Sequence, residues 1–174
     1  MSLAAKAQRI KALILDVDGV LTDGRIGFGL PAGEIKFFDT KDGHALKLLR
    51  RAGLQAGLLS GRKSPAQTQL AAELELDFCL EGEKDKAAGW LRLLEERGLQ
   101  PEECLYVGDD LVDLPVLRLA GLGVAVADAV PEVKAAAAWT TVAPGGQGAV
   151  REVVVWLLQQ QGKWAAATAR YVKP

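Results

Sequence analysis

KALILDVDGVLTDG, residues 11–24, is the stretch that decides the fold of this chain. Its apolar run, Ala12–Leu15, is too short for a helix of its own and is typical of a fully buried central strand. Because side chains alternate along a strand, Asp16 and Asp18 share one side while the valine between them turns toward the core. Gly19 then lets the chain leave the sheet in a conformation that residues with a Cβ avoid.

The two aspartates predict a cation site at the end of this strand. Two carboxylates held side by side repel, and one of them keeps its proton unless a cation lies between them. Oxygen ligands suit a hard divalent cation such as Mg²⁺, although such a site also accepts Mn²⁺ or Co²⁺. The alternative is a pair of solvated turn aspartates, which are common after strands.

The composition is that of one globular domain, which we expect to span residues 1–174. A chain of 174 residues with 49% hydrophobic and 25% charged residues can bury one sizeable core. Its net charge of -1 gives no reason to expect nucleic acid or an anionic membrane as the main partner. Cys79 and Cys104 lack CxxC spacing, so we expect reduced thiols, with no zinc site and no disulfide framework.

The N-terminal residues do not resemble a targeting segment. Lys6, Arg9 and Lys11 precede only a brief apolar run that ends in aspartates, which is too short for a signal peptide. No apolar stretch approaches the length of a transmembrane helix. We therefore expect a cytoplasmic protein with no membrane partner.

Strands and helices alternate along the rest of the chain. Short apolar runs predict further strands at 54–59, 78–80, 105–107 and 124–126, and an extended segment at 140–142. Helical patterns lie between them, at 39–53, 64–74, 86–97, 114–120 and 131–138. This order predicts an α/β, Rossmann-like fold with a central parallel sheet and helices on both faces. Ligands bind such sheets at the carboxyl ends of the strands, where Asp16, Ser60 and Asp109 are expected to meet.

Residues 24–38 predict a β-hairpin that projects after the first strand. Leu30–Gly33 provides the turn chemistry between its two arms. Apolar residues recur along both arms, at Ile26, Phe28, Ile35 and Phe37. The arms would be exposed sheet edges if the hairpin stood alone.

Residues 148–174 predict a C-terminal helix followed by a tail. One face of this helix is apolar, with Val150, Val153, Val154, Leu157 and Leu158. Val155 and Trp156 continue the apolar character round the side, which indicates burial on more than one face. That burial is either within the monomer or against a partner subunit, which the tail from Trp164 onward is placed to reach.

The string at residues 16–24, DVDGVLTDG, resembles the nucleophile motif of haloacid dehalogenase (HAD)-type phosphatases. The resemblance implies that Asp16 is the nucleophile and that Asp18 is the general acid and base. It also implies an Mg²⁺ site made by the side chains of Asp16 and Asp109 and the backbone carbonyl of Asp18, completed by water and phosphate.

The second and third motifs of that family are matched in the same order. Ser60 lies where the family places a Ser or Thr, and its hydroxyl and the amide of Gly61 would donate to phosphoryl oxygens. Lys86 matches the lysine that holds nucleophile and phosphate together. Taken alone, each residue is also ordinary, as a loop serine or a surface lysine at a helix start.

The fourth motif is matched by GDDLVD, residues 108–113. Besides Asp109, the resemblance implies that Asp110 and Asp113 serve the outer shell of the metal or orient Lys86. Asp113 is also placed to cap the helix that begins near Pro115.

The layout as a whole resembles the capless, tetrameric 3-deoxy-D-manno-octulosonate 8-phosphate (KDO 8-phosphate) phosphatases. Only a hairpin and a helix separate the first two motifs, and the gap from Leu80 to Lys86 is short, so no cap domain fits. FDTKDG at 38–43 and GGQGAVRE at 145–152 extend the resemblance over nearly the whole chain. It implies a homotetramer whose hairpins assemble around a fourfold axis, with tail residues near a neighbour's site. A neighbouring subunit would also cover a site that has no cap.

This resemblance implies Mg²⁺-dependent hydrolysis of KDO 8-phosphate through a phosphoaspartate, in lipopolysaccharide precursor synthesis. Lys41, Arg62 and Arg151 are basic candidates for the phosphate and carboxylate of the substrate. His44 stands where relatives are expected to have an aromatic residue, and we interpret it as a packing or capping residue. Two alternatives stay open: a phosphatase of a nine-carbon, sialic-acid-type 9-phosphate or another sugar phosphate, and a non-catalytic oligomeric binding module.

Overall fold

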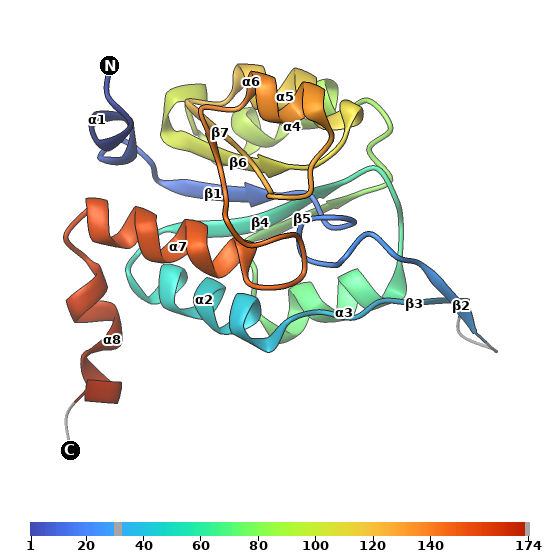
Figure 1. Cartoon of the computed structure of the whole chain (residues 1–174), viewed down its shortest axis with the longest axis horizontal. Helices are drawn as coiled ribbons and strands as arrows, with labels where there is room; N and C mark the ends of the chain where they lie inside the picture. Colours follow the sequence, from blue (N-terminus) through green and yellow to red (C-terminus); the bar gives the residue numbers. More distant parts are fainter. Residues whose placement is uncertain (30–32, 173–174) are drawn as a thin grey trace.

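The computed structural model describes residues 1–29 and 33–172 (Figure 1). A six-stranded sheet has the order β5-β4-β1-β6-β7-β8, and every neighbouring pair is parallel. The strands are β1 (Ala12–Leu15), β4 (Gln55–Ser60), β5 (Phe78–Glu81), β6 (Cys104–Gly108), β7 (Leu122–Ala125) and β8 (Trp139–Thr140). The predicted α/β fold with a central parallel sheet is confirmed.

Helices cover both faces of the sheet (Figure 1). On one side lie α2 (Thr40–Arg51), α3 (Pro65–Glu73) and α7 (Ala149–Gln160). On the other side lie α4 (Lys86–Arg97), α5 (Leu114–Leu119) and α6 (Pro131–Ala136). Short 3₁₀ turns occupy Pro101–Glu103 and Leu111–Asp113. Within the described ranges, none of the helices has the length and apolar character needed to cross a membrane.

β1 lies in the middle of the sheet because its four residues are apolar on both faces, and all of them are fully buried. Leu15, its last residue, pairs with Leu58 of β4 and Val107 of β6. Asp16 and Asp109 therefore leave adjacent strands at the same edge of the sheet. This register brings the first and fourth motifs together.

The hairpin consists of β2 (Gly27–Gly29) and β3 (Gly33–Ile35), which pair antiparallel with Phe28 opposite Glu34. It projects from the carboxyl edge of the main sheet, as predicted (Figure 1). Phe28 and Phe37 are 80% and 81% exposed. Of the predicted turn, residues 30–32 lie outside the described part of the chain.

The two ends of the chain differ from the expectation. Leu3–Ala7 forms a short helix, α1, which Ser2 caps by accepting a hydrogen bond from the amide of Ala5, and this helix was not predicted. The segment predicted as a tail contains a helix, α8 (Trp164–Val172). Tyr171 of α8 contacts its own chain, with its hydroxyl 3.0 Å from Nε2 of His44.

The apolar side of α7 is covered largely within the monomer. The five residues of its predicted apolar face are fully buried. Trp156, which continues that face, is half-buried against Trp139 of β8, with ring centroids 5.2 Å apart. Of the two readings of this helix, burial inside the monomer therefore accounts for most of its apolar surface.

The two cysteines carry no disulfide. Cys79 and Cys104 are both free. Burial raises the pKa of Cys79 to about 11 and that of Cys104 to about 12, so both remain protonated thiols near neutral pH.

Candidate active site

The loop after β1 is shaped by a glycine and a threonine. Gly19 has a φ of 88°, and a Cβ at this position would lie 2.1 Å from Oδ2 of Asp109. Glycine is therefore required here both for the turn and for the approach of the carboxylate. The hydroxyl of Thr22 closes the loop by accepting hydrogen bonds from the amides of Gly19 and Gly24, each at 3.2 Å.

Lys86 joins two carboxylates at the bottom of the site. It is the first residue of α4, which Asp85 caps by accepting a hydrogen bond from the amide of Ala88 at 3.0 Å. Its Nζ lies 2.8 Å from Oδ1 of Asp16 and 2.6 Å from Oδ1 of Asp113. Burial disfavours the ammonium, but the two carboxylates outweigh it and raise the pKa of Lys86. The buried lysine therefore stays charged.

Asp113 is fully buried, and both of its oxygens are occupied. Oδ1 accepts hydrogen bonds from Lys86 and from the hydroxyl of Tyr106, each at 2.6 Å. Oδ2 accepts from the amides of Asp109 at 2.9 Å and Asp110 at 3.2 Å. The predicted capping of α5 by this side chain is wrong, because Asp113 stands at the N-cap position but its carboxylate accepts no hydrogen bond from the amides of α5.

Asp110 has a different environment from Asp113. It is exposed at the rim of the cavity, and its carboxylate accepts a hydrogen bond from the amide of Leu111 at 2.7 Å. Among the described contacts it makes none with Lys86. Of the two aspartates that the sequence offered for orienting the lysine, the structure brings Asp113 to it.

The carboxylates fit a hard divalent cation. Asp16, Asp109 and Asp113 each offer an oxygen within 4.8 Å of the others, and Oδ1 of Asp109 is buried without a hydrogen bond among the described residues. Burial and the nearby Asp113 carboxylate raise the pKa of Asp16 to about 6 and that of Asp109 to about 8. Because the oxygens of Asp113 are already occupied, Asp16 and Asp109 are the available ligands. A cation between them would stabilise both ionised carboxylates and so oppose the burial and the repulsion from Asp113 that raise their pKa values.

Ser60 and Gly61 line the same cavity. Ser60 ends β4 and is 1% exposed, and its hydroxyl accepts a hydrogen bond from the amide of Arg62 at 3.2 Å. The cavity has a volume of about 490 Å³. Its lining contains most of the predicted site residues: Asp16, Asp18, Ser60, Gly61, Arg62, Lys86, Asp109 and Asp110.

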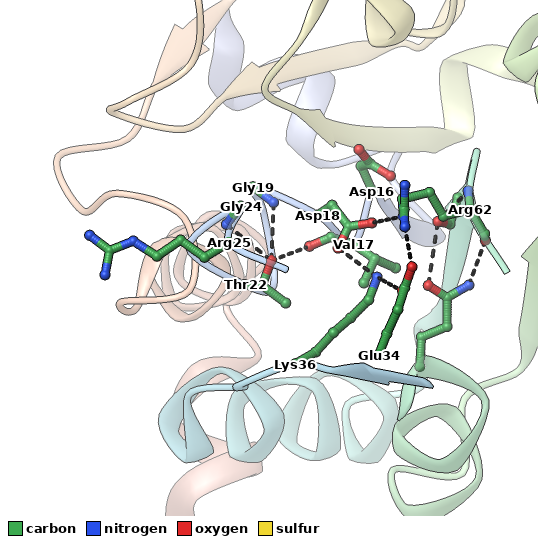
Figure 2. A network of polar contacts seen from close by, with 12 residues as sticks. Asp16, Val17, Asp18, Gly19, Thr22, Gly24, Arg25, Glu34, Lys36 and Arg62 are labelled. Atoms are coloured by element: carbon green, nitrogen blue, oxygen red, sulfur yellow. Dashed lines mark hydrogen bonds and ion pairs between the residues drawn. The ribbon is translucent and has the colours of Figure 1, made fainter. Parts of the chain in front are cut away.

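Asp18 lies between two basic side chains (Figure 2). Lys36 places its Nζ 2.5 Å from Oδ1, and Arg62 places its Nε 3.7 Å from Oδ2. Arg62 also forms an ion pair with Glu34. Sequence reasoning missed Lys36 and Glu34, although the alternation along the second hairpin arm places both on the face opposite Ile35 and Phe37.

Two predicted substrate-binding residues do not line this cavity in the single chain. Lys41 is exposed and pairs with Asp39 at 2.9 Å. The side chain of Arg151 lines a separate groove beside Trp139 and Trp156. The substrate-binding roles of Lys41 and Arg151 therefore stay predictions, because neither residue lines the cavity of its own chain.

The two stretches that extend the family resemblance contact each other and the loop after β1. Asp42, from residues 38–43, accepts hydrogen bonds from the amides of Gly148 at 3.2 Å and Arg151 at 2.7 Å. The amide of Gly146 donates to the carbonyl of Val20 at 2.9 Å. Residues 145–152 therefore support the loop that carries Asp16 and Asp18.

Comparison with known proteins gives a consistent result. Residues 79–152 match a family model described as haloacid dehalogenase-like hydrolase. The chain is 42% identical over 159 residues to the 3-deoxy-D-manno-octulosonate 8-phosphate phosphatase KdsC of Escherichia coli K12, covering 91% of this chain and 85% of that one.

Two solved structures are similar over nearly the whole chain. One is the 3-deoxy-D-manno-octulosonate 8-phosphate phosphatase of Moraxella catarrhalis in complex with magnesium, phosphate and KDO. Its TM-score is 0.93 at 34% identity, covering 97% of each chain. The other is the cobalt-bound form of the phosphatase YrbI of Haemophilus influenzae. Its TM-score is 0.90 at 40% identity, covering 97% of this chain and 99% of that one.

Proposed function

Because this chain belongs to the KDO 8-phosphate phosphatases of the haloacid dehalogenase-like hydrolases, we propose that it hydrolyses KDO 8-phosphate to KDO and phosphate. The observation that carries the proposal is the single cavity lined by Asp16, Asp18, Lys86 and Asp109. It contains a nucleophile, an acid, a buried cation and a free metal ligand within reach of one phosphoryl group. The reaction would serve lipopolysaccharide precursor synthesis in the cytoplasm.

In the first step, a carboxylate oxygen of Asp16 attacks phosphorus and the bond from phosphorus to the sugar oxygen breaks. Asp18 gives its proton to that oxygen, so the sugar acid leaves as an alcohol and Asp16 carries the phosphoryl group. The hydroxyl of Ser60 and the amide of Gly61 donate hydrogen bonds to the phosphoryl oxygens. Lys86, which Asp113 holds in place, balances the negative charge.

In the second step, water attacks the phosphorus of the phosphoaspartate while Asp18 takes its proton. The bond from phosphorus to Asp16 breaks, phosphate leaves, and both aspartates return to their starting forms. One water is consumed for each ester hydrolysed. The two steps together need no co-reactant other than this water.

Mg²⁺, when bound, would neutralise charge on the phosphoryl group. The side chains of Asp16 and Asp109 and the backbone carbonyl of Asp18 would hold it, with Asp110 in its outer shell. This donor set consists of oxygens alone, as Mg²⁺ prefers. The proposal agrees with Oδ1 of Asp109, which is buried and has no hydrogen-bond partner among the residues that the structure describes.

The proposed assembly is a homotetramer built on the hairpin. The exposed apolar side chains of Phe28, Ile35 and Phe37 support it, since a projecting edge strand with apolar residues is normally covered. Lys41 and Arg151 lie outside the cavity lining of their own chain, so as substrate-binding residues they would act where subunits meet.

The test is phosphate release from a panel of sugar phosphates that includes the eight- and nine-carbon 2-keto acids. We would measure it with Mg²⁺ and with chelator, for wild type and Asp16→Asn. Preference for KDO 8-phosphate, abolished by both changes, is the expected result. Preference for the nine-carbon 9-phosphate would move the substrate assignment, and no turnover of any ester would favour a binding module.

A further inference from the structure

Four charged side chains form a closed ring at the mouth of the cavity (Figure 2). This ring, which we call the rim ring, consists of Asp18, Lys36, Glu34 and Arg62. Lys36 Nζ lies 2.5 Å from Asp18 and 3.8 Å from Glu34, and Arg62 pairs with the same two carboxylates. When Asp18 is ionised, as it is after giving up its proton in the first step, charges of opposite sign alternate around the ring and the ring is neutral.

Lys36 is the member whose position is most costly to hold. Its side chain is completely buried, with 0% exposure, whereas that of Arg62 is 45% exposed. A buried ammonium is strongly unfavourable unless a carboxylate pairs with it at close range. The short contact with Asp18 meets that requirement, so Lys36 and Asp18 fix each other's positions.

The hairpin delivers Lys36 to this point by its strand alternation. Glu34 and Lys36 face the cavity loop, whereas Ile35 and Phe37 are exposed. The same segment therefore has a charged face toward Asp18 and an apolar face away from it. Solvation does not require this orientation of Lys36, because a lysine on the outer face would be hydrated at no cost.

We propose that Lys36 is a positioning residue for Asp18, an inference that rests on the proposed phosphatase function. Asp18 must present one oxygen to the sugar oxygen in the first step and to water in the second. Lys36 holds Oδ1 of Asp18 at 2.5 Å, whereas Oδ2 has only the longer contact of 3.7 Å with Nε of Arg62, so Oδ2 is the oxygen left for the substrate. Misplacement of a reacting group by about 1 Å can lower the rate by about 10²-fold, so a fixed orientation of the Asp18 carboxylate should raise the rate.

The inference is tested by how the rate depends on the leaving group. Lys36→Met keeps the apolar stem and removes the ammonium. Phosphoenzyme formation would be followed in single turnovers with Mg²⁺ on two substrates. KDO 8-phosphate has an alkoxide leaving group that needs a proton, whereas the phenolate of p-nitrophenyl phosphate leaves without one.

We expect Lys36→Met to slow phosphoenzyme formation from KDO 8-phosphate by about 10- to 100-fold, which is part of the usual general-acid contribution. On p-nitrophenyl phosphate the loss should stay below about threefold, and the KM for KDO 8-phosphate should hardly change. In an Asp18→Asn background, Lys36→Met should add little, because the lysine acts through that carboxylate.

Lys11→Met is the matched control. Lys11 also pairs with a carboxylate, Glu103, at 2.5 Å, but it precedes β1 at the other edge of the sheet, so its removal should leave both rates unchanged. If Lys36→Met does not fold, Lys36→Met combined with Glu34→Gln removes one charge of each sign and keeps the ring neutral. The same leaving-group dependence is expected of it.

Equal losses on the two substrates, a rise in KM alone, or full additivity with Asp18→Asn would each overturn the assignment of Lys36. A wild-type protein that cleaves neither ester would instead overturn the proposed function. The two failures are therefore distinguishable in one data set.

Discussion

The floor and the rim of the cavity are built in opposite ways. The floor, Asp16, Lys86 and Asp113, lies at strand ends and a helix start, and its side chains are at most 8% exposed. On the rim, Lys36 comes from a projecting hairpin, and Arg62 comes from the turn after β4 with almost half its surface exposed. The proposed nucleophile, Asp16, is therefore held by groups of the sheet and a helix start, whereas the proposed proton donor, Asp18, is held from the hairpin. Changes to the floor should therefore stop the reaction, and changes to the rim should tune it.

The largest expected effect comes from Asp16, the proposed nucleophile on the floor. Asp16→Asn removes the attacking carboxylate but keeps its shape, and Lys86 retains its second partner, Asp113. We expect kcat for KDO 8-phosphate to fall by roughly 10⁴-fold or more, with the fold retained. Steady-state phosphate release, with circular dichroism as the check on folding, measures it. Residual activity within tenfold of wild type would exclude Asp16 as nucleophile.

The next largest effect is expected on the free energy of unfolding, when the buried lysine of the floor is removed. Lys86→Met would leave Asp16 and Asp113 facing each other in a buried site, so it should destabilise the protein by about 3–5 kcal/mol as well as lower kcat. Urea unfolding of this variant, beside Lys11→Met as the exposed-lysine control, measures the difference. A free energy of unfolding equal to that of the control would show that the floor is not held by this lysine.

The floor and the rim of the cavity also differ in how well the sequence predicts them. Asp16, Asp18 and Asp109 stand at the ends of apolar runs, so local strings predict them and the strand register brings them together. Lys36 meets Asp18 across 18 positions of sequence, through a hairpin whose direction no local pattern fixes. Glu34 and Lys36 on an alternating edge strand look like solvated charges until the hairpin is placed.

Two helical features were also not predictable from local sequence: the capping of α5 and the presence of α8. Asp113 stands at a capping position, but its Oδ1 accepts hydrogen bonds from Lys86 and Tyr106, which belong to other elements. The helix α8 was missed because part of its packing is against α2, far away in the sequence, where Tyr171 contacts His44. In both cases, contacts between residues far apart in the sequence determine the local structure.

The floor should further show a dependence on pH that metal removes. In the metal-free protein, burial and Asp113 raise the pKa of Asp109 from 3.8 to about 8, and that of Asp16 to about 6. Between about pH 4 and pH 8 the folded state holds protons that the unfolded state has released, so stability falls as the pH rises through this window.

Mg²⁺ competes with those protons for the same oxygens, so it should bind more tightly as they leave. The increase in Tm on adding Mg²⁺ should therefore be larger near pH 8 than near pH 6, and thermal scans at the two values measure it. In Asp109→Asn the increase should be small at both values. An increase that shrinks with rising pH would contradict the cation site.

The smallest effect on the monomer is expected on the outer face of the hairpin. Phe28 and Phe37 are largely exposed, so replacing both by serine should change the free energy of unfolding of the single chain by no more than about 0.5 kcal/mol. If the hairpin is the subunit interface, the same change should convert a tetramer to smaller species, which sedimentation velocity detects. Phe78, buried at the edge of the sheet, gives the contrasting variant, since Phe78→Ser should unfold the core.

The rim ring links this outer face to the reaction, because Lys36 and Phe37 are neighbours on opposite faces of the same arm. A hairpin released from its partners should therefore hold Asp18 less well. The loss of rate should again be greater for KDO 8-phosphate than for p-nitrophenyl phosphate, and smaller than that of Lys36→Met. Dissociation with unchanged rates on both esters would separate assembly from proton transfer and confine the role of the hairpin to the single chain.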